Sequence, residues 1–151
     1  MLQGESAVSE HMHSGKGLLS DHRFVVHRAA DSEEQEGLRA FFSYRDLGIE
    51  AATHGAFAAH VIRAKEAISE PMAKHRHELG FQMVYVLKGA CVFWYDGHGD
   101  VALATGDCVY QPPGIVHRFV SCSEDCELLE ITMPARFKTE EVEPTQPGTA
   151  A

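Results

Sequence analysis

Three histidines, placed in two separate segments, have the spacing of a metal site. His75 and His77 stand two residues apart in a stretch that favours an extended strand. Side chains two apart on a strand point to the same side, so these two imidazoles can share one cation. His117 follows a Pro-Pro-Gly turn at 112–114, which predicts a second strand that starts at this histidine. Three neutral imidazoles could bind a divalent metal and leave its other positions open to water, oxygen or substrate.

The residues around these histidines complete two longer patterns. In the first, four residues separate His77 from Gln82, and six more separate Gln82 from Gly89. The second pattern consists of Gly106, Pro112, Gly114 and His117. Both patterns resemble the two sequence motifs of the cupin superfamily, in their residue types and in the distances between them. The resemblance implies a small single-domain cupin, with an all-β fold in which a double-stranded β-helix, or jelly roll, closes into a barrel.

Three positions depart from the family motifs. Gln82 stands where the first motif has a glutamate, and Ser121 stands where the second motif ends in asparagine. The glycine that opens the first motif is absent, and Ser69 or Glu70 falls near its place. These departures leave the fold expectation intact, but they make the chemistry of the site less transferable.

The resemblance implies that the metal is bound by His75, His77, Gln82 and His117. A glutamine carbonyl is neutral and a weaker donor than a carboxylate, so the ion would keep nearly its full double charge. Gln82 therefore either ligates weakly or lies behind the ligands and orients water or substrate. In either case we expect the open face to favour an anionic chelating partner, such as an enolate or a carboxylate.

Imidazole ligands alone do not select one metal, because iron, nickel, copper, zinc and manganese all accept them. Cupins with three histidines and no acidic ligand include oxygen-using iron enzymes. The resemblance thus favours Fe(II), with zinc, nickel or manganese as alternatives, and a metal-dependent dioxygenase acting on a small organic molecule. Two alternatives stay open. One is a non-catalytic cupin that binds or senses a small ligand and holds a structural metal, and the other is a metal-assisted isomerase acting on a sugar or keto acid.

Short runs of β-prone residues, separated by glycine turns, independently predict an all-β sandwich or barrel. The expected strands are 41–46, 57–63, the strand that carries His75 and His77, 83–88, 90–95, 101–104, 107–111, 117–121 and 127–132. The acidic run 32–36 predicts one helical turn, with its N-cap at Asp31 or Ser32. No segment has helical periodicity over a length that would suit an α/β fold.

Aromatic residues on these strands are the expected walls of a ligand cavity beside the metal. The candidates are Phe93, Tyr95, Phe119 and Tyr110, and Gln111, just before the proline turn, is expected to face the same cavity.

Alternation along the strand at 82–88 predicts two different faces. Val84 and Val86 share the side of Gln82. The opposite side carries Met83, Tyr85 and Leu87. An apolar sheet face of this kind must be covered, which favours a homodimer.

Composition limits the partners and the compartment. The 151 residues suit one domain, expected at 21–137 between flexible tails at 1–20 and 138–151. The net charge of −9 argues against nucleic acid and anionic membranes as partners. No stretch approaches the roughly 20 apolar residues of a membrane span, and no secretory signal is recognisable, so we expect a cytoplasmic protein. Disulfides are not expected among the four cysteines, and Cys91 and Cys108 are expected to pack as small hydrophobes.

Overall fold

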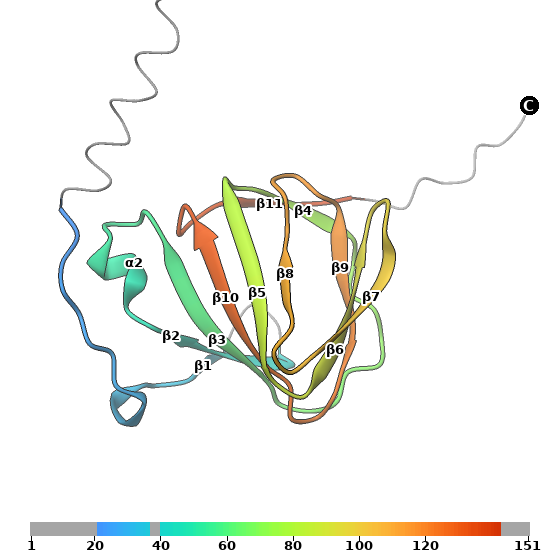
Figure 1. The fold of residues 1–151 in the computed structure, drawn as a ribbon, viewed down its shortest axis with the longest axis horizontal. Coiled ribbons are helices and arrows are strands. Elements are labelled where there is room, and N and C mark those ends of the chain that lie inside the picture. Colours follow the sequence, from blue (N-terminus) through green and yellow to red (C-terminus); the bar gives the residue numbers. More distant parts are fainter. Residues whose placement is uncertain (1–20, 37–39, 143–151) are drawn as a thin grey trace, which may run out of the picture.

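The computed structural model describes residues 21–36 and 40–142 of the chain. Within these residues, most of the regular structure is β-strand (Figure 1). The strands are β1 (Gln35–Glu36), β2 (Phe42–Asp46), β3 (Ala58–Ala64), β4 (His75–Glu78), β5 (Phe81–Lys88), β6 (Ala90–Tyr95), β7 (Gly99–Ala104), β8 (Cys108–Tyr110), β9 (His117–Cys122), β10 (Glu127–Met133) and β11 (Lys138–Glu141). Helical structure consists of a 3-10 turn, η1 (Ala29–Asp31), and one short α-helix, α2 (Ile49–Ala52). The all-β prediction is confirmed.

The strands form two antiparallel sheets. Sheet A has the order β1-β2-β3-β10-β5-β8, and sheet B has the order β11-β4-β9-β6-β7. Neighbours in space are often distant in sequence, since β10 pairs with both β3 and β5, and β9 lies between β4 and β6. The two sheets curve toward each other around a shared interior (Figure 1). This double-sheet arrangement is the predicted jelly roll.

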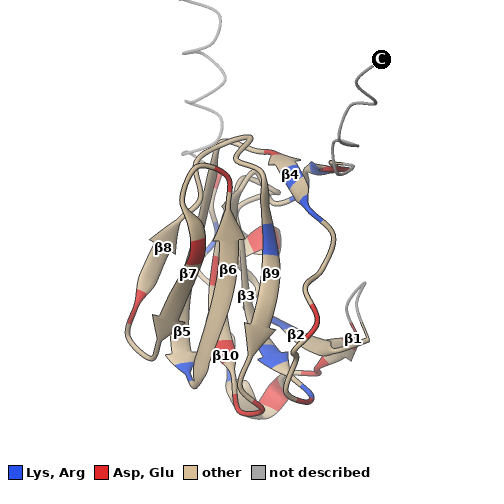
Figure 2. Ribbon diagram, turned by 90° about the vertical axis from the view of Figure 1, so that its right-hand side faces the viewer, with Lys and Arg blue, Asp and Glu red and all other residues tan. Residues whose placement is uncertain are grey.

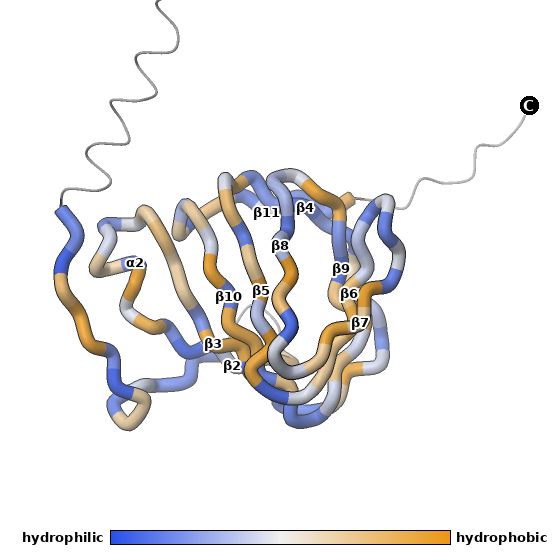
Figure 3. Tube along the Cα trace, in the orientation of Figure 1, coloured by the Kyte–Doolittle hydropathy of each residue, from blue (hydrophilic) through white to orange (hydrophobic). Residues whose placement is uncertain are grey.

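The core forms because one side of each strand is apolar and points between the sheets. Along β5, Gln82, Val84 and Val86 are at most 3% exposed, whereas Tyr85 and Leu87 are 37% and 40% exposed. The buried side chains of both sheets meet in one hydrophobic cluster. Hydrophobic and hydrophilic positions alternate along several strands (Figure 3). Burying each large apolar side chain in this interior stabilises the fold by about 1.5–3 kcal/mol.

Gly89, which ends the first motif, joins β5 to β6 at a positive φ of 72°. A Cβ at this position would overlap the Ser123 hydroxyl oxygen and come within 2.7 Å of Asp125 Oδ1. The same Ser123 hydroxyl accepts a hydrogen bond from the backbone N–H of Ala90, at 3.0 Å. Glycine is needed here both for the backbone angle and for the close approach of the β9–β10 turn.

The expected boundary of the C-terminal tail at 138 needs correction. Lys138–Glu141 form β11, which pairs with β4 from Lys138↔Glu78 to Glu141↔His75. All four residues of β11 are exposed, so backbone pairing rather than an apolar face holds the strand in sheet B. The remaining parts of the two predicted tails, 1–20 and 143–151, lie outside the described residues.

Two smaller predictions are wrong. The acidic run at 32–36 contains no helical turn, because Gln35–Glu36 pair with β2 as strand β1 and the 3-10 turn precedes them. Cys108 is exposed rather than packed, because it lies on the outward side of β8. All four cysteines are free thiols in the structure, and burial raises the pKa of Cys122 to about 11.

Charged residues lie mostly in turns and near strand ends (Figure 2). Surface ion pairs such as Arg63–Glu127 and Arg136–Glu50 join neighbouring segments, and pairs of this exposed kind each contribute little to stability. In the described part of the chain, no helix has the length and apolar character needed to cross a bilayer.

Candidate metal centre

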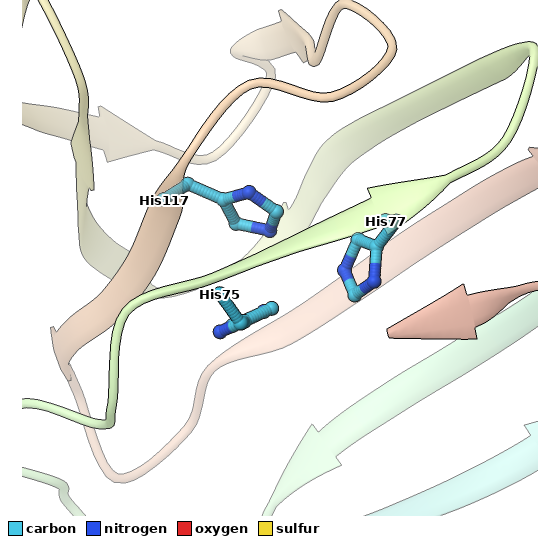
Figure 4. Close-up of side chains that lie close together, drawn as sticks. All are labelled: His75, His77 and His117. Atoms are coloured by element: carbon cyan, nitrogen blue, oxygen red, sulfur yellow. The ribbon is translucent and has the colours of Figure 1, made fainter. Parts of the chain in front are cut away.

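The fold brings His75, His77 and His117 together. β4 supplies the first two and β9 the third, and His75 is the register partner of His117 where these strands meet. One ring nitrogen from each histidine lies within 4.8 Å of the other two. The three rings surround a common space (Figure 4). Because His75 and His117 are only 8% and 4% exposed, the cluster lies inside the barrel rather than on its outer surface.

Hydrogen bonds at Nδ1 set the tautomers of these rings. His75 Nδ1 and His117 Nδ1 each lie 2.9 Å from the backbone carbonyl oxygen two residues earlier in the chain. A carbonyl only accepts hydrogen bonds, so the proton must sit on Nδ1 and the lone pair on Nε2. His77 Nδ1 lies 2.8 Å from the Thr139 hydroxyl, which can accept in the same way. Three lone-pair nitrogens so arranged fit a divalent metal ion.

Strand β11 completes the surroundings of His77. Thr139 is the register partner of His77, and the Phe137 ring packs against the imidazole with 5.0 Å between ring centroids. On the outer side, Arg76 donates two hydrogen bonds to the Glu140 carboxylate, at 2.9 and 3.1 Å. These bonds raise the pKa of Arg76 and lower the pKa of Glu140. The segment expected to be a tail therefore belongs to the site.

A cavity of about 680 Å³ opens beside the three histidines, a size that suits a small organic molecule. Apolar side chains such as Val84, Phe93 and Phe119 form much of its wall. Its polar groups come from both sheets: the imidazoles lie on sheet B, and Gln82 and Glu130 lie on sheet A. A molecule in the cavity would therefore contact the histidine cluster and these two side chains from different sides.

Glu130 is a cavity residue that sequence reasoning missed. Its Oε2 accepts a hydrogen bond from Gln82 Nε2 at 3.1 Å, and its strand neighbour on β3 is His60. Burial raises the pKa of Glu130, while the Gln82 hydrogen bond and the nearby His60 act in the opposite sense. Alternation could have found it, because Glu130 shares the inward side of β10 with the buried Leu128 and Thr132.

The predicted cavity residues have mixed outcomes. Gln111, Phe93 and Phe119 line the cavity. Tyr95 lies behind the cavity wall. Its ring stacks on that of His117, with 5.9 Å between the ring centroids and 28° between the ring planes, and its hydroxyl accepts a hydrogen bond from Gln111 Nε2. Tyr110 is wrong as a cavity wall, because it is 52% exposed on the outward side of β8.

Within the described residues, the three histidines are the one group of His, Cys, Asp or Glu side chains with metal-binding spacing, and the group contains no carboxylate. Gln82 lines the same cavity, so a contact with a bound ion remains a prediction for this residue. An ion held by three neutral imidazoles would keep its positive charge largely uncancelled.

The fold and the site together define a class of protein: a jelly-roll barrel with a three-histidine cluster beside an internal cavity. Residues 60–132 match the family model described as a cupin domain. This match supports a small cupin domain in the chain, in agreement with its two motifs. No curated protein matches the chain.

Solved structures share the fold at low sequence identity. The polyketide cyclase RemF from Streptomyces resistomycificus is 17% identical with a TM-score of 0.67, over 82% of this chain and 89% of that one. The nucleoside dehydratase Pac13, from Streptomyces, is 13% identical with a TM-score of 0.60, over 80% and 92%. A cupin-superfamily sugar phosphate isomerase from Silicibacter pomeroyi is 17% identical with a TM-score of 0.63, over 80% and 83%. At these identities the likeness shows the fold alone.

Proposed function

We propose that this chain is a metal-dependent enzyme that moves protons on a small, oxygen-rich molecule, as isomerases, dehydratases and cyclases do. The observation that carries the proposal is a carboxylate, Glu130, that lines the same cavity as the three histidines from the other sheet. The activities named for similar structures, a polyketide cyclase, a nucleoside dehydratase and a sugar phosphate isomerase, fall in this broad class.

The residues divide the work between the two sheets. A divalent ion on His75, His77 and His117 would supply Lewis acidity to a substrate oxygen. Glu130 would take a proton from the carbon or hydroxyl next to that oxygen and return it elsewhere, because burial raises its pKa and so makes its carboxylate a stronger base than an exposed glutamate. Phe119 and the other apolar walls would limit the access of water to the transfer.

We assign Gln82 to the positioning of Glu130 rather than to the metal. Its amide nitrogen donates to the Glu130 carboxylate, which fixes the orientation of the acid–base group. Gln82→Glu tests this assignment, because a second carboxylate would replace a donor to Glu130 with a repelling charge. We expect turnover to fall and the pH optimum to rise. A large gain in metal affinity with unchanged turnover would instead identify Gln82 as a ligand.

The second candidate is the dioxygenase that the motif resemblance favours, with Fe(II) as the metal. The observation in its favour is the ligand group of three neutral histidines without a carboxylate. A binding or sensing protein with a structural metal is the third possibility. Both alternatives predict no exchange of substrate hydrogen with solvent.

The deciding experiment follows isotopes and oxygen together. Protein loaded with Fe(II), Zn(II), Ni(II) or Mn(II) is incubated in D2O with β-diketones, keto acids and aldose or ketose phosphates. Oxygen uptake and deuterium incorporation are then recorded. We expect deuterium incorporation without oxygen uptake, lowered at least 100-fold in Glu130→Gln. Oxygen uptake that matches product formation would establish the dioxygenase instead.

Glu127→Gln is the matched control for Glu130→Gln. Glu127 lies on the same strand, but it pairs with Arg63 outside the cavity, at 2.9 Å. Its replacement should leave deuterium incorporation unchanged. Equal losses in the two variants would show that the effect of Glu130→Gln is structural.

We further propose an anionic chelating substrate, because the ligand group adds no negative charge to the ion. The comparison of acetylacetone with neutral acetone tests this idea, and equal affinities would contradict it.

We also propose a cytoplasmic homodimer. The outer face of sheet A exposes Tyr85, Leu87 and Tyr110, which a second copy would cover, and the free thiols suit a reducing compartment. Light scattering of the purified protein gives its mass directly, and a monomer at micromolar concentration would contradict the dimer.

A further inference from the structure

Gln111 is a buried polar residue whose side chain is only half satisfied. It follows β8, is 2% exposed and lines the cavity. Its backbone N–H donates to the Gln82 carbonyl at 2.9 Å, and its side-chain Nε2 donates to the Tyr95 hydroxyl at 2.6 Å. Its Oε1 is buried and has no hydrogen-bond partner. Buried polar atoms are nearly always paired, so an unpaired acceptor on a residue of the cavity wall points to a ligand.

The side chain is held rigidly enough to act as a recognition group. Tyr95, which holds Nε2, is 3% exposed and stacks between Phe93 and His117, with ring centroids 5.8 and 5.9 Å away. A rigid acceptor has lost its side-chain freedom before a ligand arrives, so a ligand gains more from bonding to it. A purely structural role would need only the bond to Tyr95 and would not leave the second polar atom of the amide without a partner.

We infer that Gln111 Oε1 is a specificity-determining acceptor for a hydroxyl group of the substrate. This inference rests on the proposed metal-dependent function, because it assumes that another part of the substrate chelates the ion at the three histidines. The preferred substrate then carries at least one hydroxyl beyond its chelating atoms, as sugar acids and other polyhydroxylated carbonyl compounds do. A site built to bond a hydroxyl discriminates strongly against the analogue that lacks it.

Two acids with the same chelating end test the inference. Erythronate and 2-hydroxybutanoate both offer a carboxylate and a 2-hydroxyl, but only erythronate has hydroxyls at C3 and C4. Their dissociation constants are measured on Co(II)-loaded protein by visible absorption and calorimetry. We expect erythronate to bind about 10- to 100-fold more tightly. In Zn(II)-loaded protein, the side-chain amide signal that is absent from Gln111→Met should shift with erythronate alone.

Gln111→Met keeps the length of the side chain and removes both polar atoms, so the preference for erythronate should disappear while 2-hydroxybutanoate affinity stays within twofold. Gln35→Met makes the same replacement at an exposed position of β1 and should keep the full preference. If Gln111→Met loses its metal or its fold, Tyr95→Phe replaces it, and loss of the clamp should lower the affinity for erythronate alone.

The outcomes separate this inference from the proposed function. Equal affinities of the two acids for the unaltered protein overturn the role of Gln111 and leave the metal site standing. A full preference retained in Gln111→Met, or in Tyr95→Phe where that variant is used, overturns it as well. If neither acid perturbs the Co(II) spectrum, the chelating function and the recognition role fail together.

Discussion

Replacing Thr139 with valine should weaken metal binding about tenfold while leaving the barrel folded. The Thr139 hydroxyl lies 2.8 Å from His77 Nδ1 and so helps to present the opposite ring nitrogen to the ion. Valine has nearly the same shape and suits a strand, so β11 should keep its pairing with β4. The variant therefore isolates one hydrogen bond to one of the three candidate ligands.

The magnitude follows from the exposure of that bond. A neutral hydrogen bond contributes about 0.5–1.5 kcal/mol net, which is roughly a 2- to 13-fold change in a dissociation constant. Hydrogen bonds behind metal ligands reach 10- to 100-fold in affinity where they are sheltered. Thr139 is exposed, so water can partly replace the hydroxyl, and the loss of metal affinity should stay near tenfold.

The assay is a titration of metal-free protein with Zn(II) in competition with a chromophoric chelator. Thr139→Ser retains the hydroxyl and should bind within twofold of the unaltered protein. An unchanged dissociation constant in Thr139→Val would refute the contribution of β11 to the site. A loss above 1,000-fold with intact strand content would also refute the reasoning, because one exposed bond is too weak to cause it.

The remaining predictions concern the ligands, the cavity carboxylate and the outer face. His117→Ala should abolish stoichiometric metal binding, measured as metal content by atomic emission. His98→Ala changes a histidine in the β6–β7 turn and should keep the metal content of the unaltered protein. Glu130→Gln should stabilise the folded protein at pH 7–8 but not at pH 4. The pKa of Glu130 is raised in the folded state, so the folded protein binds this proton more tightly than the unfolded chain does. The free energy of unfolding of the unaltered protein therefore falls as pH rises from 4.5 to the raised pKa, by about 1.4 kcal/mol for each unit by which the pKa is raised. Melting temperatures across pH test this, and parallel curves for the two proteins would count against it. Tyr85→Lys should shift the mass measured by light scattering from dimer to monomer without lowering metal content, and an unshifted mass would remove this face as the interface.

Local rules predicted the histidine cluster and most strands. The spacing of His75 and His77 fixes their shared side within one strand, and the turn before His117 is equally local. The prediction that Tyr110 lines the cavity was wrong because it considered the aromatic ring and not the alternation along β8. Val109 and Gln111, on either side of Tyr110, point inward, so Tyr110 points outward.

Features that depend on distant pairing were not visible in the sequence. β11 has four exposed residues and no apolar alternation, so only its pairing with β4 reveals it as a strand. Glu130 and Gln82 are far apart in the chain and meet because β10 and β5 are neighbours in sheet A. The hydrogen bond between them could not be predicted without knowing that these two strands are neighbours.

The way β4 is attached to the barrel has a consequence for the molecule as a whole. β4 and β11 pair along four positions, but β4 meets β9 at a single position, His75↔His117. An ion bound by His75, His77 and His117 would join β4, and with it β11, to β9 through a second connection besides the backbone. Metal binding should therefore add to the stability of this part of sheet B, beyond the few backbone contacts between β4 and β9.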